Sequence, residues 1–184
     1  LWTFALMPTH LEELFNQSRK NNKAVLLGYI PAGFPTQKKA KKIVKAMIDG
    51  GIDAIEIGYP YSDPVMDGPV IQSASEEAIN NGAGVEEVFE LLKMSVELGV
   101  PSVVMSYWSP IEKYGVSMFA SEIAKKGGSG VITPDLTFEE SDVWRSEAAR
   151  NSINRIYVVA PSSGEDRLIK VTNECSGFIY AASL

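Results

Sequence analysis

Three acidic side chains are concentrated in the stretch AIEIGYPYSDPVMDGP, residues 54–69. Glu56 lies within an apolar run that is typical of a buried strand, and Asp63 and Asp67 follow in a proline-rich loop. Burial raises the pKa of an unpaired carboxyl group and so suits it to proton transfer near neutral pH. We therefore interpret Glu56 as a candidate general acid or base. The alternative is a structural residue that pairs with a lysine.

The two aspartates of this loop also fit turns. Asp67 precedes Gly68, and on spacing alone a catalytic carboxylate and an Asx turn are equally good interpretations. Asp63 precedes Pro64, and here a turn is the better interpretation of the local sequence.

Three tyrosines come near the ends of predicted strands. Tyr29, Tyr107 and Tyr180 are expected to end the first, third and sixth of them. A tyrosine presents a flat apolar ring with a polar tip. Together the three indicate a pocket for a flat aromatic ligand.

Composition excludes several other kinds of chemistry. The 184 residues are 45% apolar and carry a formal charge of −6, which predicts one globular domain or part of a larger one, with no nucleic-acid partner and no anionic membrane surface as partner. The single cysteine, Cys175, excludes an intrachain disulfide and a cysteine-based metal cluster, and fits a cytoplasmic protein. The single histidine, His10, excludes a serine–histidine triad and a histidine-rich metal site.

Six short runs rich in β-forming residues alternate with helical periodicity, which fills the gaps over stretches such as 40–48 and 88–96. The longest gap, after the second run, holds the loop described above and a predicted helix over 71–82. The predicted strands are 24–30, 52–58, 102–107, 130–135, 155–161 and 177–182.

This alternation predicts an α/β fold with a parallel sheet covered by helices. A doubly wound sheet and a (β/α)8 barrel both fit, although no predicted strand is followed by the G-x-G-x-x-G turn of the dinucleotide-binding version of the first. In both architectures ligands bind at the carboxyl ends of the strands. The loop that follows Glu56 is therefore expected to form the site.

Several segments together resemble the tryptophan synthase alpha subunit family. They are GYIPAGFP (28–35), IEIGYPYSDPVMDGPVIQ (55–72), VVMSYWSPIEKYG (103–115), VITPDL (131–136) and the two strand segments at 155–163 and 177–183. The resemblance implies a (β/α)8 TIM barrel, of which about six βα units are present in this chain.

The resemblance also implies an activity, the retro-aldol cleavage of indole-3-glycerol phosphate to indole and glyceraldehyde 3-phosphate. It places Glu56 as the general acid/base and Asp67 as the carboxylate that binds the indole N–H. It implies no metal and no cofactor in this chain, because pyridoxal phosphate belongs to the beta subunit of the family. The positions that match the lining of the substrate pocket are Tyr29, Ile71, Tyr107 and Tyr180.

A beta subunit is the partner that the resemblance implies, in an alpha2beta2 tetramer. Asp63 and Pro64 match the loop that contacts this partner, and Asp135 matches a position that helps to relay its state. Two positions depart from the family pattern. Ser109 stands where asparagine is usual, and Phe138 lies near a common proline, so loop geometry and coupling to the partner are expected to differ.

The family pattern also divides the chain. Residues 1–6 are expected to be an upstream extension before a start at Met7, and residues 7–184 a partial barrel without the last two βα units and their phosphate-binding loops. Such a chain is expected to bind phosphate poorly and to catalyse little on its own. The alternative functions are a non-catalytic partner of a beta subunit, a stand-alone indole-producing lyase, and another phosphate-binding isomerase or aldolase, which would normally need a strand-end lysine or histidine that the six runs lack.

Overall fold

The computed structural model describes residues 8–183, so the predicted extension at 1–6 and the predicted start at Met7 lie outside the described residues. Each of the six predicted runs overlaps a strand, although β1 ends one residue after its run and β5 begins one residue before its run. The strands are β1 (Leu27–Pro31), β2 (Ala54–Gly58), β3 (Ser102–Met105), β4 (Gly130–Thr133), β5 (Asn154–Val159) and β6 (Tyr180–Ala181).

The strands form one parallel sheet in which each strand pairs with the next in sequence, from β1 to β6. A doubly wound sheet reverses its strand order at a switch point, so this sequential order excludes that alternative. Within the described residues β1 and β6 each pair with one neighbour only, and the sheet is an open half-barrel. The prediction of a partial (β/α)8 barrel is confirmed.

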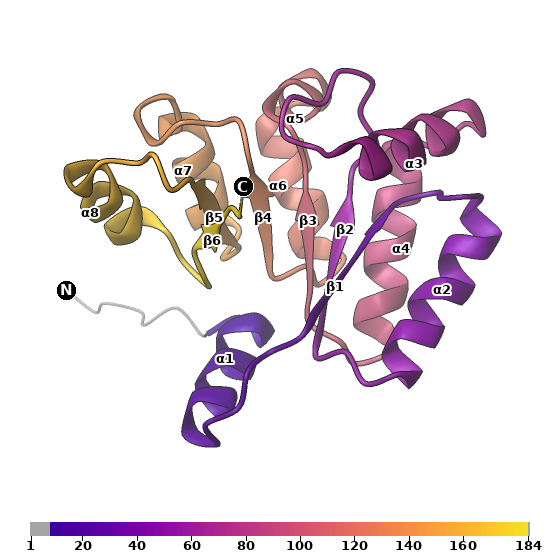
Figure 1. Ribbon diagram of the computed structural model, residues 1–184, viewed down its shortest axis with the longest axis horizontal. Coiled ribbons are helices and arrows are strands. Elements are labelled where there is room, and N and C mark those ends of the chain that lie inside the picture. Colours follow the sequence, from indigo (N-terminus) through magenta and orange to yellow (C-terminus); the bar gives the residue numbers. More distant parts are fainter. Residues whose placement is uncertain (1–7, 184) are drawn as a thin grey trace.

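Helices cover the outer, convex side of the sheet, and α1 lies beneath the amino ends of the strands (Figure 1). None of the described helices is both long and apolar enough to span a bilayer. The helices are α1 (His10–Lys20), α2 (Gln37–Asp49), α3 (Pro69–Asn80), α4 (Val85–Glu97), α5 (Trp108–Tyr114), α6 (Val116–Lys125), the 3-10 turn η1 (Phe138–Glu140), α7 (Asp142–Arg150) and α8 (Glu165–Glu174).

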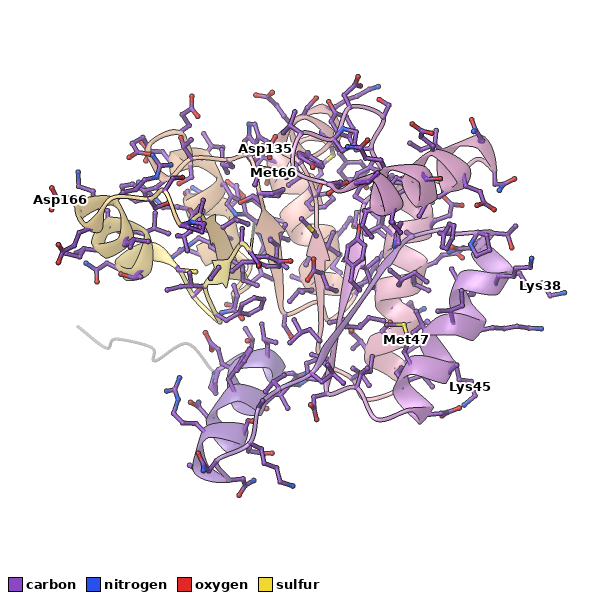
Figure 2. All side chains as sticks on the ribbon, in the orientation of Figure 1. Lys38, Lys45, Met47, Met66, Asp135 and Asp166 are labelled. Atoms are coloured by element: carbon purple, nitrogen blue, oxygen red, sulfur yellow. The ribbon has the colours of Figure 1, made fainter. Side chains whose placement is uncertain are left out.

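The lysine-rich helix α2 is amphipathic, with one apolar face and one charged face. Ala40 and Val44 are buried against the sheet, whereas Lys38 and Lys45 extend away from the molecule (Figure 2). The hydroxyl of Thr36 accepts a hydrogen bond from the Lys39 amide and begins the helix. The lysine run is therefore a solvated helix face.

Two apolar cores lie on the two sides of the sheet. Side chains alternate between the faces of a strand, so Ile55 and Ile57 of β2 pack outward against the helices. Ala54 packs inward with residues such as Val103 and Ile132. Glu56 has the same parity as Ala54, and it therefore points to the inside of the half-barrel.

A closed set of hydrogen bonds fixes α1 to β5. A capping box begins α1, with the Thr9 hydroxyl accepting from the Glu12 amide and the Glu12 carboxylate accepting from the Thr9 amide. The same hydroxyl donates to Oδ1 of Asn154 at 2.6 Å, and Nδ2 of Asn154 donates to Glu12 at 2.7 Å. Gly130 makes room for this network, because a Cβ there would lie 2.9 Å from the Asn154 carbonyl oxygen.

Candidate active site

Glu56 is the central residue of β2, and its side chain is only 6% exposed. In the parallel register it is the partner of Tyr29 on β1 and of Val103 on β3. Among the ion pairs of residues 8–183, none involves Glu56. The alternative of a structural glutamate neutralised by a lysine therefore finds no support in the structure.

The surroundings of Glu56 raise the pKa of its carboxyl group from 4.5 to about 7. Burial is the larger cause, because it disfavours the charged form, and the negative charge of Asp67 acts in the same direction. A carboxyl group with a pKa near 7 exists in both protonation states at neutral pH. It can therefore donate a proton in one step and accept one in another.

Asp67 lies in the loop between β2 and α3, just before Gly68 and Pro69 begin that helix. Its backbone is fixed because Nε2 of Gln72 donates to the Asp67 carbonyl at 2.8 Å. Burial raises the pKa of the Asp67 carboxyl group, and the nearby Tyr107 hydroxyl partly offsets this rise. Asp67 therefore lies close to a residue of another loop, the one that follows β3.

The structure brings the three tyrosines together, but their predicted places at strand ends are only partly correct. Tyr107 follows β3 by two residues, whereas Tyr29 is the central residue of β1 and Tyr180 is the first residue of β6. Burial raises the pKa of Tyr29, and the neighbouring Asp67, Glu56, Tyr107 and Tyr180 raise it further. The inward parity of these strands, rather than the strand ends, makes the rings converge.

Gly58 provides the space for one of these rings. It is the inward position on β2 that follows Glu56, and a Cβ there would overlap the Tyr29 hydroxyl. Because glycine leaves this position empty, the phenol of Tyr29 reaches across from β1 onto the inner face of β2.

Ile71 lies in the first turn of α3 and lines a cavity of about 660 Å3. The cavity also contacts Tyr29, Phe34 and Val70, and its lining comes from β1, α2, α3 and the loops between them, without Glu56 or Asp67. This apolar space therefore opens along the free edge of β1, beside the two acids rather than over them.

The three candidate partner residues lie in two loops. Asp63 and Pro64 lie in the loop after β2, and Asp135 lies in the loop after β4. Asp63 is exposed and accepts a hydrogen bond from the Ser62 hydroxyl at 2.6 Å, and Pro64 is half-buried. Asp135 is tied to the neighbouring loop, because its Oδ1 accepts from the Trp108 amide at 2.9 Å. Burial raises the pKa of Asp135, and this hydrogen bond lowers it. Asp135 and Met66 lie at the same end of the sheet (Figure 2).

The short helix α5 was not among the expected elements. Its first turn holds Ser109 and Pro110, and proline is tolerated there because an N–H in the first turn has no partner within the helix. The other unusual position, Phe138, begins η1, and its ring lies 4.6 Å from the Arg145 guanidinium. Within 8–183, no group of three or more His, Cys, Asp or Glu side chains is arranged to hold a metal ion.

These features define a class of protein. A parallel half-barrel that carries an inward glutamate on its second strand, and an aspartate in the loop above it, has the arrangement expected of a β/α-barrel enzyme. Residues 15–184 match the family described as tryptophan synthase alpha chain. The chain belongs to this family, and the resemblance seen in the sequence motifs is confirmed.

Individual relatives show the same similarity. The tryptophan synthase alpha chain of Thermobifida fusca is 47% identical over 176 residues, which cover 96% of this chain and 65% of the relative. The alpha chain of Nocardia farcinica is 45% identical, over 95% of this chain and 66% of the relative. This chain thus spans about two thirds of the length of these relatives.

Solved structures agree with the sequence matches. A tryptophan synthase of M. tuberculosis, in an open form with BRD0059 bound, superposes with a TM-score of 0.93 at 40% identity, covering 96% of this chain and 71% of that chain. The tryptophan synthase alpha subunit of Legionella pneumophila gives a TM-score of 0.91 at 28% identity, covering 96% of this chain and 68% of that chain.

Proposed function

We propose that this chain carries the acid–base groups of a lyase that cleaves indole-3-glycerol phosphate into indole and glyceraldehyde 3-phosphate. The observation that supports this most directly is Glu56, buried on the inner face of β2, with a pKa raised to about 7 by burial and by the nearby Asp67. Membership of the tryptophan synthase alpha chain family supplies the substrate and the reaction.

The reaction breaks a carbon–carbon bond, so the indole ring must first become able to accept an electron pair. Protonated Glu56 gives its proton to the ring carbon that bears the glycerol chain, and the ring acquires a positive charge. Asp67 accepts a hydrogen bond from the indole N–H and stabilises this charge. Each group is expected to lower the barrier by about 3 to 5 kcal/mol.

Glu56 then acts in the opposite sense. As a carboxylate it removes the proton of the glycerol hydroxyl next to the bond that breaks, and the carbonyl of glyceraldehyde 3-phosphate forms as the bonding electron pair moves into the ring. Indole leaves with the first proton, and Glu56 ends the cycle protonated. One carboxyl group performs both transfers because its pKa lies near the working pH.

The substrate is expected to lie among Tyr29, Ile71, Tyr107 and Tyr180, whose rings and aliphatic chain suit a flat indole. In the family the phosphate is held by loops of the last βα units. The described residues form six strands, with open edges at β1 and β6, and we expect this half-barrel by itself to release little indole.

The proposed partner is a tryptophan synthase beta subunit, which would carry pyridoxal phosphate and receive the indole directly in an alpha2beta2 assembly. The exposed Asp63, the adjacent Pro64 and Asp135 are the candidate contact and relay residues. No nucleic-acid or membrane partner is proposed, and a single free cysteine fits a cytoplasmic location.

Indole release from indole-3-glycerol phosphate, measured with the full-length gene product, tests the proposal. Glu56→Gln and Asp67→Asn are each expected to lower kcat at least 100-fold, and Glu97→Gln on the exposed face of α4 is the matched control. If both site variants release indole at the wild-type rate, the assignment is wrong.

Two rival functions are separated by the same proteins together with a beta subunit. A protein that never cleaves the substrate, yet activates the beta subunit, would be a non-catalytic partner. A protein that releases indole rapidly without any beta subunit would be a stand-alone lyase.

A further inference from the structure

The hydroxyl of Tyr107 makes two contacts with the segment that carries Asp67. It accepts a hydrogen bond from the Met66 amide at 2.9 Å. The same hydroxyl lies close enough to the Asp67 carboxylate to favour the ionised form of that group and so to lower its pKa. The phenol oxygen has lone pairs with which it accepts from the Met66 amide.

The ring that carries this hydroxyl is itself held in place. Tyr107 is only 5% exposed, and its ring packs against that of Tyr61, with centroids 5.4 Å apart. On one side of Tyr107, the Ser106 amide donates to the Ile132 carbonyl of β4 at 3.0 Å. On the other side, the Trp108 amide donates to the Asp135 carboxylate. The phenol is thus fixed by β4 and by the loop that follows it.

The loop that Tyr107 contacts has little support of its own. Val65 is 76% exposed and Met66 is 50% exposed, so the centre of the loop buries little apolar surface. The carbonyl of Asp67 is anchored on the α3 side by Gln72. The Tyr107 hydroxyl provides the corresponding anchor on the β3 side.

From these contacts we infer that Tyr107 is a positioning residue. Its hydroxyl holds the Met66–Asp67 segment against the site, and Asp135 supports the tyrosine through the Trp108 amide. This deepens the proposed function and rests on it only for the catalytic role of Asp67, since the contacts themselves are independent of any reaction.

The arrangement connects Asp135 to the Met66–Asp67 segment through the Trp108 amide, the Tyr107 phenol and the Met66 amide. A change at Asp135 would alter the placement of the phenol and hence of the Asp67 segment. The loop after β4 therefore controls the geometry of the loop after β2, although the two loops share no direct hydrogen bond among the bonds of the described residues.

The substitution Tyr107→Phe keeps the ring and removes only the hydroxyl. We expect the Met66 amide to exchange with solvent at least fivefold faster by NMR, because it loses its acceptor. We also expect the titration of the Asp67 carboxyl group, followed by carbon-detected NMR, to move to higher pH. The matched control is Tyr114→Phe, which removes the hydroxyl of a tyrosine that packs against Phe89 and Phe119. It should change neither measurement.

Asp135→Ala tests the support of the tyrosine without changing the phenol, and it should also speed the exchange of the Met66 amide. Wild-type exchange at Met66 in both variants would overturn the inference, and so would an unchanged Asp67 titration in a folded Tyr107→Phe protein. Both measurements are made without substrate. If they change as expected while indole release by full-length Tyr107→Phe stays at the wild-type rate, the positioning role stands and the catalytic role proposed for Asp67 fails.

Discussion

The burial of Glu56 predicts that the native fold loses stability as the pH rises through neutrality. Below pH 4.5 the carboxyl group is protonated in both the folded and the unfolded chain, so its burial adds no pH-dependent cost. Between pH 4.5 and about 7 the group ionises in the unfolded chain but stays protonated in the fold. Above that range the carboxyl group is ionised in the folded chain as well. The loss of folding stability caused by burying this charge is then complete.

The size of this effect follows from the two pKa values. A rise from 4.5 to about 7 corresponds to about 3 kcal/mol of lost folding stability above neutral pH. Glutamine has nearly the same shape as glutamic acid and cannot ionise. The ionisation of Glu56 should therefore contribute almost no difference in unfolding free energy between Glu56→Gln and the wild type at pH 4. At pH 8.5 it should make the variant more stable than the wild type by about 3 kcal/mol.

Urea unfolding followed by circular dichroism at several pH values measures the difference directly. The matched control is Glu97→Gln, which removes a carboxylate whose side chain is 65% exposed, and its stability should track that of the wild type. The reasoning is refuted if the unfolding free energy of Glu56→Gln rises no further above the wild-type value at pH 8.5 than at pH 4.

Three further outcomes are expected. Asp67→Asn removes the negative charge that contributes to the raised pKa of Glu56, so the Glu56 titration in an NMR experiment should move to lower pH; an unchanged titration would leave burial as the sole cause. Asn154→Ala deletes both hydrogen bonds that join β5 to the cap of α1 and should lower the unfolding free energy by about 2 kcal/mol in urea, whereas a loss below about 0.5 kcal/mol would show that the network contributes little. Lys41→Met breaks an exposed ion pair with Glu90 and should change the same free energy by no more than about 1 kcal/mol; a larger loss would contradict the expected weakness of surface pairs.

The central strands could be predicted well from the sequence because they are buried along their whole length. β2 and β4 are buried at every position, and they consist of small and apolar residues apart from Glu56 and Thr133. The predicted ends of the strands were less accurate, because a strand ends where its hydrogen bonds to the neighbouring strand end. The predicted run 177–182 holds a two-residue strand, and this strand pairs only with Val158 and Val159 of β5.

The site could be predicted only in part. The inward position of Glu56 follows from the two-residue period of a strand, which is a local property. The hydrogen bond from the Met66 amide to Tyr107 joins residues 41 positions apart, and that from Trp108 to Asp135 spans 27 positions. Contacts of this kind depend on the conformations of two loops at once, and no local sequence pattern specifies them.

The network that joins the cap of α1 to Asn154 also constrains the order of folding. Thr9 and Asn154 are 145 positions apart in the chain, so α1 cannot form this network until β5 has been synthesised. At a synthesis rate of about 5–20 residues per second, α1 remains without this anchor for roughly 7 to 30 seconds. During that time Leu11, which is fully buried in the finished fold, must be sheltered in another way. Helix α1 is thus among the last parts of the half-barrel to be locked into place.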